Sequence, residues 1–459
     1  MELQPFGPSS VVTESPGLSR PLQQNLNLSV ARLNATSVST VQERLNQLDE
    51  RNSLERVPVT SEQKLVGRIQ FLALCWTLFL EGWNDGSTGP LLPRLQNVYH
   101  ADLTIISLIF VFACLGFILG VLANIPLTDK LGFGKTIVLG SICQLVGYAI
   151  QSSAPPFPVF VMAYTINGVG LALQNAQANG FVGTLKSQPE SKMGMLHAAY
   201  GLGAFASPLV ATQFARLPRW SFHFLVSLGI AISNTVILIC VFKLQKQDDC
   251  MREAGETVVE RTQTMEDNTF RQVMRTRVVH IFAVFILVYV GVEVTMGGWV
   301  VTYIIDVRGG GPSAGYISSG FFGGLTVGRL ALLWVNRKIG ERYVMFIYTA
   351  IGLALEIVIW LVPSLIGNAL AIATVGVLLG PMYPIVMNQS SRILPRWILT
   401  GSIGWIAGFG QAGSALFPFG TGVISTKYGI KSLQPMLVSM MAFMIALWAF
   451  VPKAARRPD

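Results

Sequence analysis

Four acidic side chains and one arginine interrupt the long apolar segments of this chain. They are Glu81, Asp85, Glu293, Arg329 and Glu356. A charge inside a segment of this kind is unfavourable by several kcal/mol unless it is paired, hydrated or neutralised by a proton. A carboxyl group in such a place can take up and release protons, so we expect these residues to mark functional positions.

Glu81 and Asp85 are the most suggestive pair of acids. They are four residues apart, so a helix places them on the same face. We expect Asp85, and also Glu81, to couple protons to another process. The alternative is that Glu81 bonds permanently to a neighbouring helix and that Asp85 alone is functional.

The remaining charged residues fall in the second half of the chain. Glu293 is one helical turn from Tyr289, and with Trp299 it is a candidate to line a cavity. Arg329 either pairs with Glu293 or lies near the cytosolic end of its segment as a structural clasp, since arginine can extend its head to the interface. For Glu356 the sequence indicates only a helix contact or a hydrated defect.

Amide side chains concentrate in the apolar segment at about 157–184. A further amide side chain, that of Asn388, lies at the end of the segment at about 366–390. Amides both donate and accept hydrogen bonds, so they suit hydroxyl-rich or polar organic ligands. Their alternative role is hydrogen bonding between helices. The candidates for a solute cavity are Asn84, Asn167, Gln174, Asn175, Asn179 and Asn388, together with Tyr289 and Trp299.

The composition argues against an ordinary soluble enzyme, because 51% of the 459 residues are hydrophobic and only 12% are charged. About a quarter are charged in a typical soluble domain. Gly134-Lys135-Thr136 ends like a phosphate loop, but the first glycine of that motif is replaced by Asp129. The four histidines are scattered and no paired CxxC occurs. We therefore expect no catalytic site, no metal and no cofactor, and an ion gradient as the energy source.

Twelve apolar segments are each long enough to cross a bilayer. They predict an all-α membrane protein with twelve transmembrane helices in two pseudo-symmetric halves of six. The segments lie at about 69–91, 104–125, 136–154, 157–184, 193–214, 221–243, 278–304, 313–335, 343–363, 366–390, 398–425 and 432–451.

The basic residues predict the orientation of these segments. The N-terminal tail and alternate connections hold 26 of the 33 Lys and Arg, the other connections hold 6, and Arg329 lies inside a segment. Positive charge gathers on the cytosolic side of membrane proteins. We expect both termini to be cytosolic, and the net charge of +9 then reports topology and not a nucleic-acid partner.

The chain divides into five parts. Residues 1–65 are expected to be a disordered cytosolic tail, 66–244 and 278–452 the two six-helix halves, 245–277 a cytosolic central loop, and 453–459 a cytosolic tail. The turns at 127–135 and 335–342 resemble each other. A duplication of this kind is typical of transporters whose halves rock about a site at the membrane midplane.

The turn Asp129-Lys130-x-Gly132-x-x-Lys135 resembles the signature loop of the major facilitator superfamily, although Ile125 stands where that loop begins with glycine. The resemblance implies a cytosolic gate made by Asp129, Lys130, Gly132 and Lys135. The alternative is a solvated turn.

Within that superfamily the chain is similar to the fucose permease branch of proton-coupled sugar transporters, and to its fungal members. The matching stretches are 81–85, 91–93, 175–180, 289–293, 324–329 and 381–384. The branch has a proton-carrying glutamate where this chain has Asn175, which cannot titrate. The resemblance therefore implies that any proton coupling rests on the acids that remain.

The expected function is secondary active transport of a small polar or hydroxylated organic solute, by alternating access and coupled to protons. Alternatives are efflux of a metabolite by proton antiport, facilitated uniport, and a non-transporting nutrient sensor. The expected partners are the solute, protons and the lipid bilayer, and the expected location is the plasma membrane. The sequence indicates neither the solute nor an oligomeric state.

Overall fold

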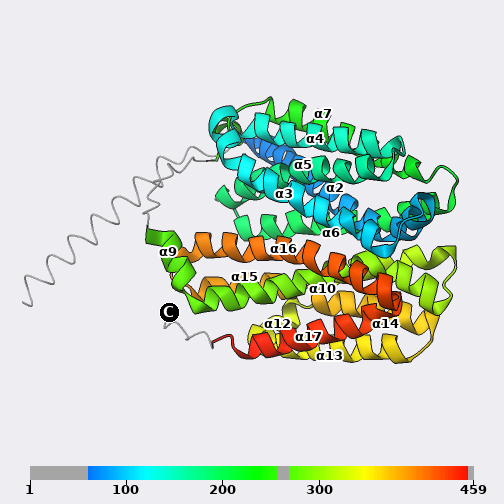
Figure 1. The fold of residues 1–459 in the computed structure, drawn as a ribbon. Coiled ribbons are helices and arrows are strands. Elements are labelled where there is room, and N and C mark those ends of the chain that lie inside the picture. The colour runs from blue at the N-terminus through cyan, green and yellow to red at the C-terminus, as the bar shows by residue number, and fades with distance from the viewer. Residues whose placement is uncertain (1–59, 186, 257–267, 453–459) are drawn as a thin grey trace, which may run out of the picture. The chain divides into compact units, whose positions relative to one another are not determined.

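The computed structural model describes residues 60–185, 187–256 and 268–452. These residues form helices joined by short turns (Figure 1), and no strand occurs among them. Ser61–Asp459 is one compact unit. Helix α2 begins at Ser61, four residues before the predicted end of the N-terminal tail. Residues 1–59 and the predicted C-terminal tail at 453–459 lie outside the described residues.

The first group of helices corresponds to the predicted N-terminal half (Figure 1). It contains α2 (Ser61–Tyr99), α3 (Leu103–Leu131), α4 (Phe133–Ser152), α5 (Phe157–Thr184), α6 (Pro189–Arg216), η1 (Trp220–Phe222) and α7 (His223–Phe242). Two short helices follow in the predicted central loop, α8 (Gln247–Glu253) and α9 (Asn268–Arg275).

The second group corresponds to the predicted C-terminal half. It contains α10 (Arg277–Arg308), η2 (Pro312–Gly315), α11 (Tyr316–Ala331), α12 (Leu333–Ile339), α13 (Glu341–Leu361), α14 (Leu365–Leu379), α15 (Met382–Ile393), α16 (Arg396–Tyr428), η3 (Ile430–Ser432) and α17 (Leu433–Ala449).

In the described part of the chain, nine helical stretches are long and apolar enough to cross a membrane. The pair η2–α11 and α12 makes a tenth if it is taken as one span, and it bends by 51° at the break. The long helices α6 and α16 are outside this set because glycine, serine and threonine dilute their apolar residues. An all-helical membrane protein is therefore supported, while the count of twelve spans and the cytosolic termini stay predictions.

Small residues in α6 allow it to pack closely against α2. A Cβ atom on Gly203 would lie 2.0 Å from the Phe79 carbonyl oxygen, and one on Gly82 would lie 1.9 Å from that of Tyr200. Any side chain at these two positions would force the helices apart. Close packing through small residues is typical of membrane helices, and here it places α6 beside the acids of α2.

Hydrogen bonds join the two groups toward one end of the bundle, which we call the far end, where α2 ends and α3 begins. Thr104 donates to Thr426 (2.9 Å), Cys114 to the Gln411 carbonyl (3.3 Å) and Arg216 to the Pro312 carbonyl (3.1 Å). At the opposite end, which we call the basic end, ion pairs hold each group together separately. Lys192 pairs with Glu256 (4.0 Å) in the first group.

The two similar turns of the sequence have the same backbone feature. Gly132 and Gly340 have φ of +80° and +96°, and each precedes a helix at the basic end. Each also caps the helix before it, through N–H bonds to Thr128 (2.9 Å) and Asn336 (3.0 Å). Glycine adopts positive φ without steric penalty, so the repeated glycine has a structural reason in both halves.

Candidate functional site

Glu81 and Asn175 form a close polar contact between α2 and α5. The Asn175 amide donates to both carboxylate oxygens of Glu81, at 2.8 and 3.0 Å. Asn179, one turn further along α5, donates to the side-chain oxygen of Asn175 (3.0 Å). All three side chains are half-buried. The Asn175 amide thus holds a carboxylate supplied by α2.

Asp85 lies one turn beyond Glu81 and is bound by two neutral donors. The Tyr200 hydroxyl of α6 donates to it at 2.7 Å, and the Asn84 amide donates at 3.2 Å. Its side chain is exposed, although neighbouring Gly86 packs against the backbone of α6. Solvent therefore reaches this carboxyl group in the middle of a long apolar helix.

Asn84 connects this carboxyl group to the interior of the first group. Its side-chain oxygen accepts hydrogen bonds from Asn167 (2.6 Å) and Tyr148 (3.2 Å). Both donors are buried, on α5 and α4 respectively. The position of Asn84, and with it one ligand of Asp85, is therefore fixed by two other helices.

The second group contributes an ion pair. Arg329 of α11 lies 3.7 Å from Glu293 of α10, and both side chains are mostly buried. Glu293 and Asp85 carry the same charge and lie near enough to act on one another across the interface of the two groups. Arg329 is thus the partner of Glu293 in this conformation, while its role as a structural clasp or in the cavity stays a prediction.

Tyr289 and Trp299 are fully buried, and the Trp299 ring also lies against Phe110 of α3 in the first group. Tyr289 donates to the Leu379 carbonyl oxygen (3.2 Å) and lies beside the Glu293–Arg329 pair. The Trp299 indole donates to the Pro418 carbonyl oxygen (2.9 Å). Both side chains hold helices together at these contacts and have no surface open to a solute in this conformation.

Two of the amide candidates lie apart from the central cluster. Gln174 is buried between α5 and α4, and its one hydrogen bond among the described residues is a long one, 3.5 Å, to the Ile137 carbonyl oxygen. Asn388 is near the basic end, where it donates to Glu341 (3.2 Å). Glu341 also pairs with Arg392 (3.4 Å). Asn388 therefore belongs to a network that joins α15 to the start of α13.

Glu356 differs from the other membrane acids. It is fully buried in α13, and neither of its carboxyl oxygens has a hydrogen-bond partner among the described residues. The structure does not bring it to the central site.

The loop between α3 and α4 lies at the basic end. Asp129, Lys130 and Lys135 are exposed, and Gly132 makes the turn with its positive φ. The Gly134 N–H donates to the Gln245 carbonyl oxygen (2.9 Å), which attaches this loop to the segment after α7. The predicted gate residues are thus together and accessible.

Sequence reasoning missed two tyrosines. Tyr200 binds Asp85, and Tyr148 binds Asn84. Tyr200 follows Ala198 and Ala199 and precedes Gly201 in α6, and this setting of small residues was the available signal, because it brings α6 close to α2. Nothing in the sequence distinguishes Tyr148 from other aromatic residues in apolar helices.

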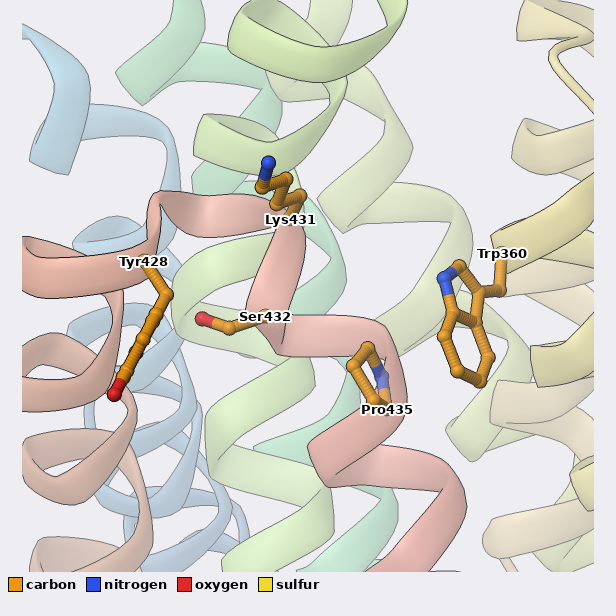
Figure 2. Close-up of a pocket in the computed structure, with 5 residues that line it drawn as sticks. All are labelled: Trp360, Tyr428, Lys431, Ser432 and Pro435. Atoms are coloured by element: carbon orange, nitrogen blue, oxygen red, sulfur yellow. The ribbon is translucent and has the colours of Figure 1, made fainter.

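A surface pocket at the far end lies outside this cluster (Figure 2). Trp360 from the end of α13 faces Pro435 of α17, and Lys431 provides the one cation of its lining. None of the candidate site residues contributes to it.

The central arrangement combines acids and neutral hydrogen-bonding groups. Glu81 and Asp85 accept bonds from amides and a hydroxyl, whereas Glu293 is paired with a cation. A carboxyl group held by neutral donors can change its proton without leaving an opposite charge unpaired. The surrounding amides and Tyr200 can donate to and accept from hydroxyl groups.

The comparison with known families agrees with the topology and the turn at 129–135. Residues 74–418 match the model of the Major Facilitator Superfamily. The chain belongs to this superfamily. The resemblance read from the sequence is thereby confirmed at the level of the superfamily.

This Major Facilitator Superfamily member is similar to proteins from yeast and bacteria. Bypass of stop codon protein 6 of Saccharomyces cerevisiae is 23% identical over 84% of this chain and 83% of its own length. A glucose/galactose transporter of Brucella abortus is 25% identical over 81% of this chain and 91% of its own.

Solved structures of superfamily transporters share the fold. A D-xylose-proton symporter has a TM-score of 0.71 at 11% identity and covers 84% of this chain and 98% of its own. The E. coli fucose:proton symporter has a TM-score of 0.58 at 17% identity and covers 84% and 99%. The fucose permease branch named from sequence motifs is therefore among the structural neighbours. Both of these solved structures are of proton symporters.

Proposed function

We propose that the chain is a secondary active transporter that moves a small hydroxylated, sugar-like solute together with protons by alternating access. The observation that carries this proposal is the pair Glu81 and Asp85 on α2, each held by neutral donors. Intramembrane acids of this kind are by default functional. The named sugar substrates of several similar proteins support the solute class.

Protonation of Asp85 changes the forces between the two groups of helices. As a carboxylate, Asp85 carries the same charge as Glu293 and is repelled by it. As a neutral acid it no longer repels Glu293, so the balance between the two arrangements of the halves shifts. A proton bound at Asp85 therefore acts on the same interface that a solute between the halves would occupy.

The contacts between the groups support an open path from the basic end. Hydrogen bonds tie the groups toward the far end, whereas the ion pairs at the basic end join residues within one group. If the basic end is cytosolic, as the positive charges predict, this conformation is open to the cytosol. We propose that Asp129, Lys130 and Lys135 form part of the gate that closes this end.

Flux into proteoliposomes tests the proposal. Labelled xylose, fucose, glucose and galactose are offered to the purified chain with and without an imposed pH gradient. We expect at least one of these sugars to accumulate against its own concentration gradient, in the direction of proton flow. Flux that ignores the gradient contradicts proton coupling and indicates a uniporter. Accumulation opposite to proton flow indicates an antiporter, and no flux or binding of any hexose or pentose contradicts the solute class.

A further inference from the structure

Two histidines lie in the helices of the first group, and their surroundings differ. His223 begins α7 and is fully buried; its Nε2 atom lies 2.8 Å from the Ser87 hydroxyl, and its ring stacks on Trp83. His197 of α6 is exposed, and in the described part of the chain its imidazole forms no hydrogen bond. Packing therefore explains His223, whereas His197 is an unbonded titratable side chain within a predicted membrane segment.

His197 lies on the face of α6 that meets the second group. Helices α6 and α11 contact each other across the interface of the two groups and run in opposite directions, because the end of α6 meets the start of α11 at the far end. A Cβ atom on Gly201 would lie 2.4 Å from the Thr326 hydroxyl oxygen. Residues three or four apart share one face of a helix, and the next residues on these two faces toward the basic end are His197 and Arg329. The two side chains therefore face each other across the interface.

The charged groups around His197 leave it with one close neighbour. Arg329 of α11 lies near enough to act on its imidazole. The nearby acids act instead on Tyr200, one turn further along α6; they are Glu81, Asp85 and Glu293. At the start of α6, Lys192 is paired with Glu256 (4.0 Å). Helices α5 and α7 also contact α6, and neither carries an Asp, Glu, Lys or Arg residue. Among the described residues, the charge opposite His197 is therefore that of a cation.

We propose that His197 is a proton-responsive positioning residue that controls, through Arg329, whether the basic end of the bundle can close. A neutral imidazole allows Arg329 to approach as the two groups come together there. A protonated imidazole places a second positive charge opposite Arg329, and two like charges in a partly buried site repel one another. Histidine suits this role because its charge ordinarily changes between about pH 5 and about pH 8. The proposal rests on the alternating access proposed above.

The proton on His197 acts on the conformation and is not carried with the solute. Asp85 remains the coupling residue, because its neutral donors allow it to exchange a proton. If the basic end is cytosolic, as the positive charges predict, acid in the cytosol holds this end open and slows the return of the empty transporter. Uptake coupled to protons acidifies the cytosol, so this arrangement makes uptake limit itself.

Energy transfer between two fluorophores on the purified full-length chain tests the proposal without any solute. The fluorophores are attached to unnatural amino acids at Asp248 and Lys338, which are exposed at the basic ends of the first and second groups. Asp85→Asn is the background, so that protons bound at Asp85 do not contribute. We expect the ratio of open to closed molecules to rise as the pH falls from about 7.5 to about 5.5. A single proton can change this ratio by up to about tenfold per pH unit.

Variants link this response to His197. His197→Asn keeps a polar side chain that cannot titrate, so it should lose the response and stay at the neutral-pH ratio. His197→Lys carries a permanent charge and should favour the open arrangement throughout the range. His100→Asn is the matched control, because His100 is exposed at the far end with a positive φ that asparagine tolerates, and it should respond as the background chain does. If His197→Lys folds poorly, His197→Asn decides alone.

The partner of His197 is tested in Arg329→Met with Glu293→Gln, which removes the cation and its acid together. We expect this double variant to lose the response although His197 is still present. Four results would overturn the proposal. They are an equal response in His197→Asn and the background chain, a shift toward the closed arrangement in acid, a single arrangement at every pH, and a response that persists without Arg329. None of them depends on solute flux, so they are distinct from a loss of pH-driven accumulation in the parent chain, which would contradict the proposed function.

Discussion

The two halves of this transporter hold their membrane acids in different ways. In the first half, Glu81 and Asp85 are bound by the neutral donors Asn175 and Tyr200. In the second, Glu293 is bound by the cation Arg329. A neutral donor allows a carboxyl group to gain or lose a proton without stranding a charge, whereas an ion pair favours one fixed state. The first half is therefore suited to exchanging protons. The second half keeps its charges fixed, and the force on those charges changes when a proton binds in the first half.

The largest effect is expected when Asp85 loses its ability to bind a proton. Asp85→Asn keeps the size of the side chain but cannot titrate, so we expect accumulation driven by a pH gradient to be abolished while the chain still folds. Flux assays in proteoliposomes measure this. Glu356→Gln is the matched control, because it removes another membrane acid outside the site. An equal loss of pH-driven accumulation in Asp85→Asn and Glu356→Gln would contradict a special role for Asp85.

Breaking the ion pair of the second half should mainly reduce stability. Arg329→Met leaves Glu293 without its cation, and we expect a loss of about 3 kcal/mol, the lower end of the range for broken buried pairs because both side chains keep some exposure. Unfolding in denaturing detergent measures it. The double variant Arg329→Met with Glu293→Gln should recover most of the loss. If the double variant is no more stable than Arg329→Met alone, the unpaired Glu293 is not the cause of the lost stability.

Exchanging the partners in the first half tests the Glu81–Asn175 contact. Asn175→Leu removes two hydrogen bonds to a carboxylate and should destabilise the chain by about 1.5–3 kcal/mol. The exchange Glu81→Asn with Asn175→Glu moves the carboxyl group to α5 and keeps the amide opposite it. We expect this exchange to restore both stability and the response to pH. An exchange variant as impaired as Asn175→Leu would mean that the helix carrying the acid matters.

The smallest effect is expected at Glu356. Its carboxyl oxygens have no partner in the described chain, so Glu356→Met removes a polar group that makes no hydrogen bond there. Replacing such a group with an apolar one of similar size is nearly neutral or stabilising, so we expect a change of no more than about 1 kcal/mol. The same unfolding assay applies. A loss as large as that of Arg329→Met would reveal a role that the described contacts do not explain.

Helix positions were predictable from the sequence because long apolar runs have few other structures available in a membrane. Each predicted segment overlaps a helix or a pair of helices. The exceptions in apolar character are α6 and α16, in which glycine, serine and threonine are frequent. The repeated turn was also visible, since Gly132 and its counterpart Gly340 hold equivalent places in the two similar stretches.

The partners of the site residues were not predictable. Glu81 and Asn175 are 94 positions apart, and their contact depends on how α2 and α5 pack. Tyr289 and Trp299 were expected to line a cavity with Glu293, but periodicity in an apolar helix does not say which face meets another helix. Asn388 was grouped with the cavity amides by residue type, whereas its depth at the basic end places it with Glu341.

A pH jump on a solid-supported membrane tests the central claim most directly, because it needs no solute. Proton binding to the reconstituted chain produces a transient current that reports charge moving into the membrane. We predict a transient for the parent chain and for Glu356→Gln, and its loss in Asp85→Asn. An undiminished transient in Asp85→Asn would contradict the assignment of Asp85 as the proton-binding residue.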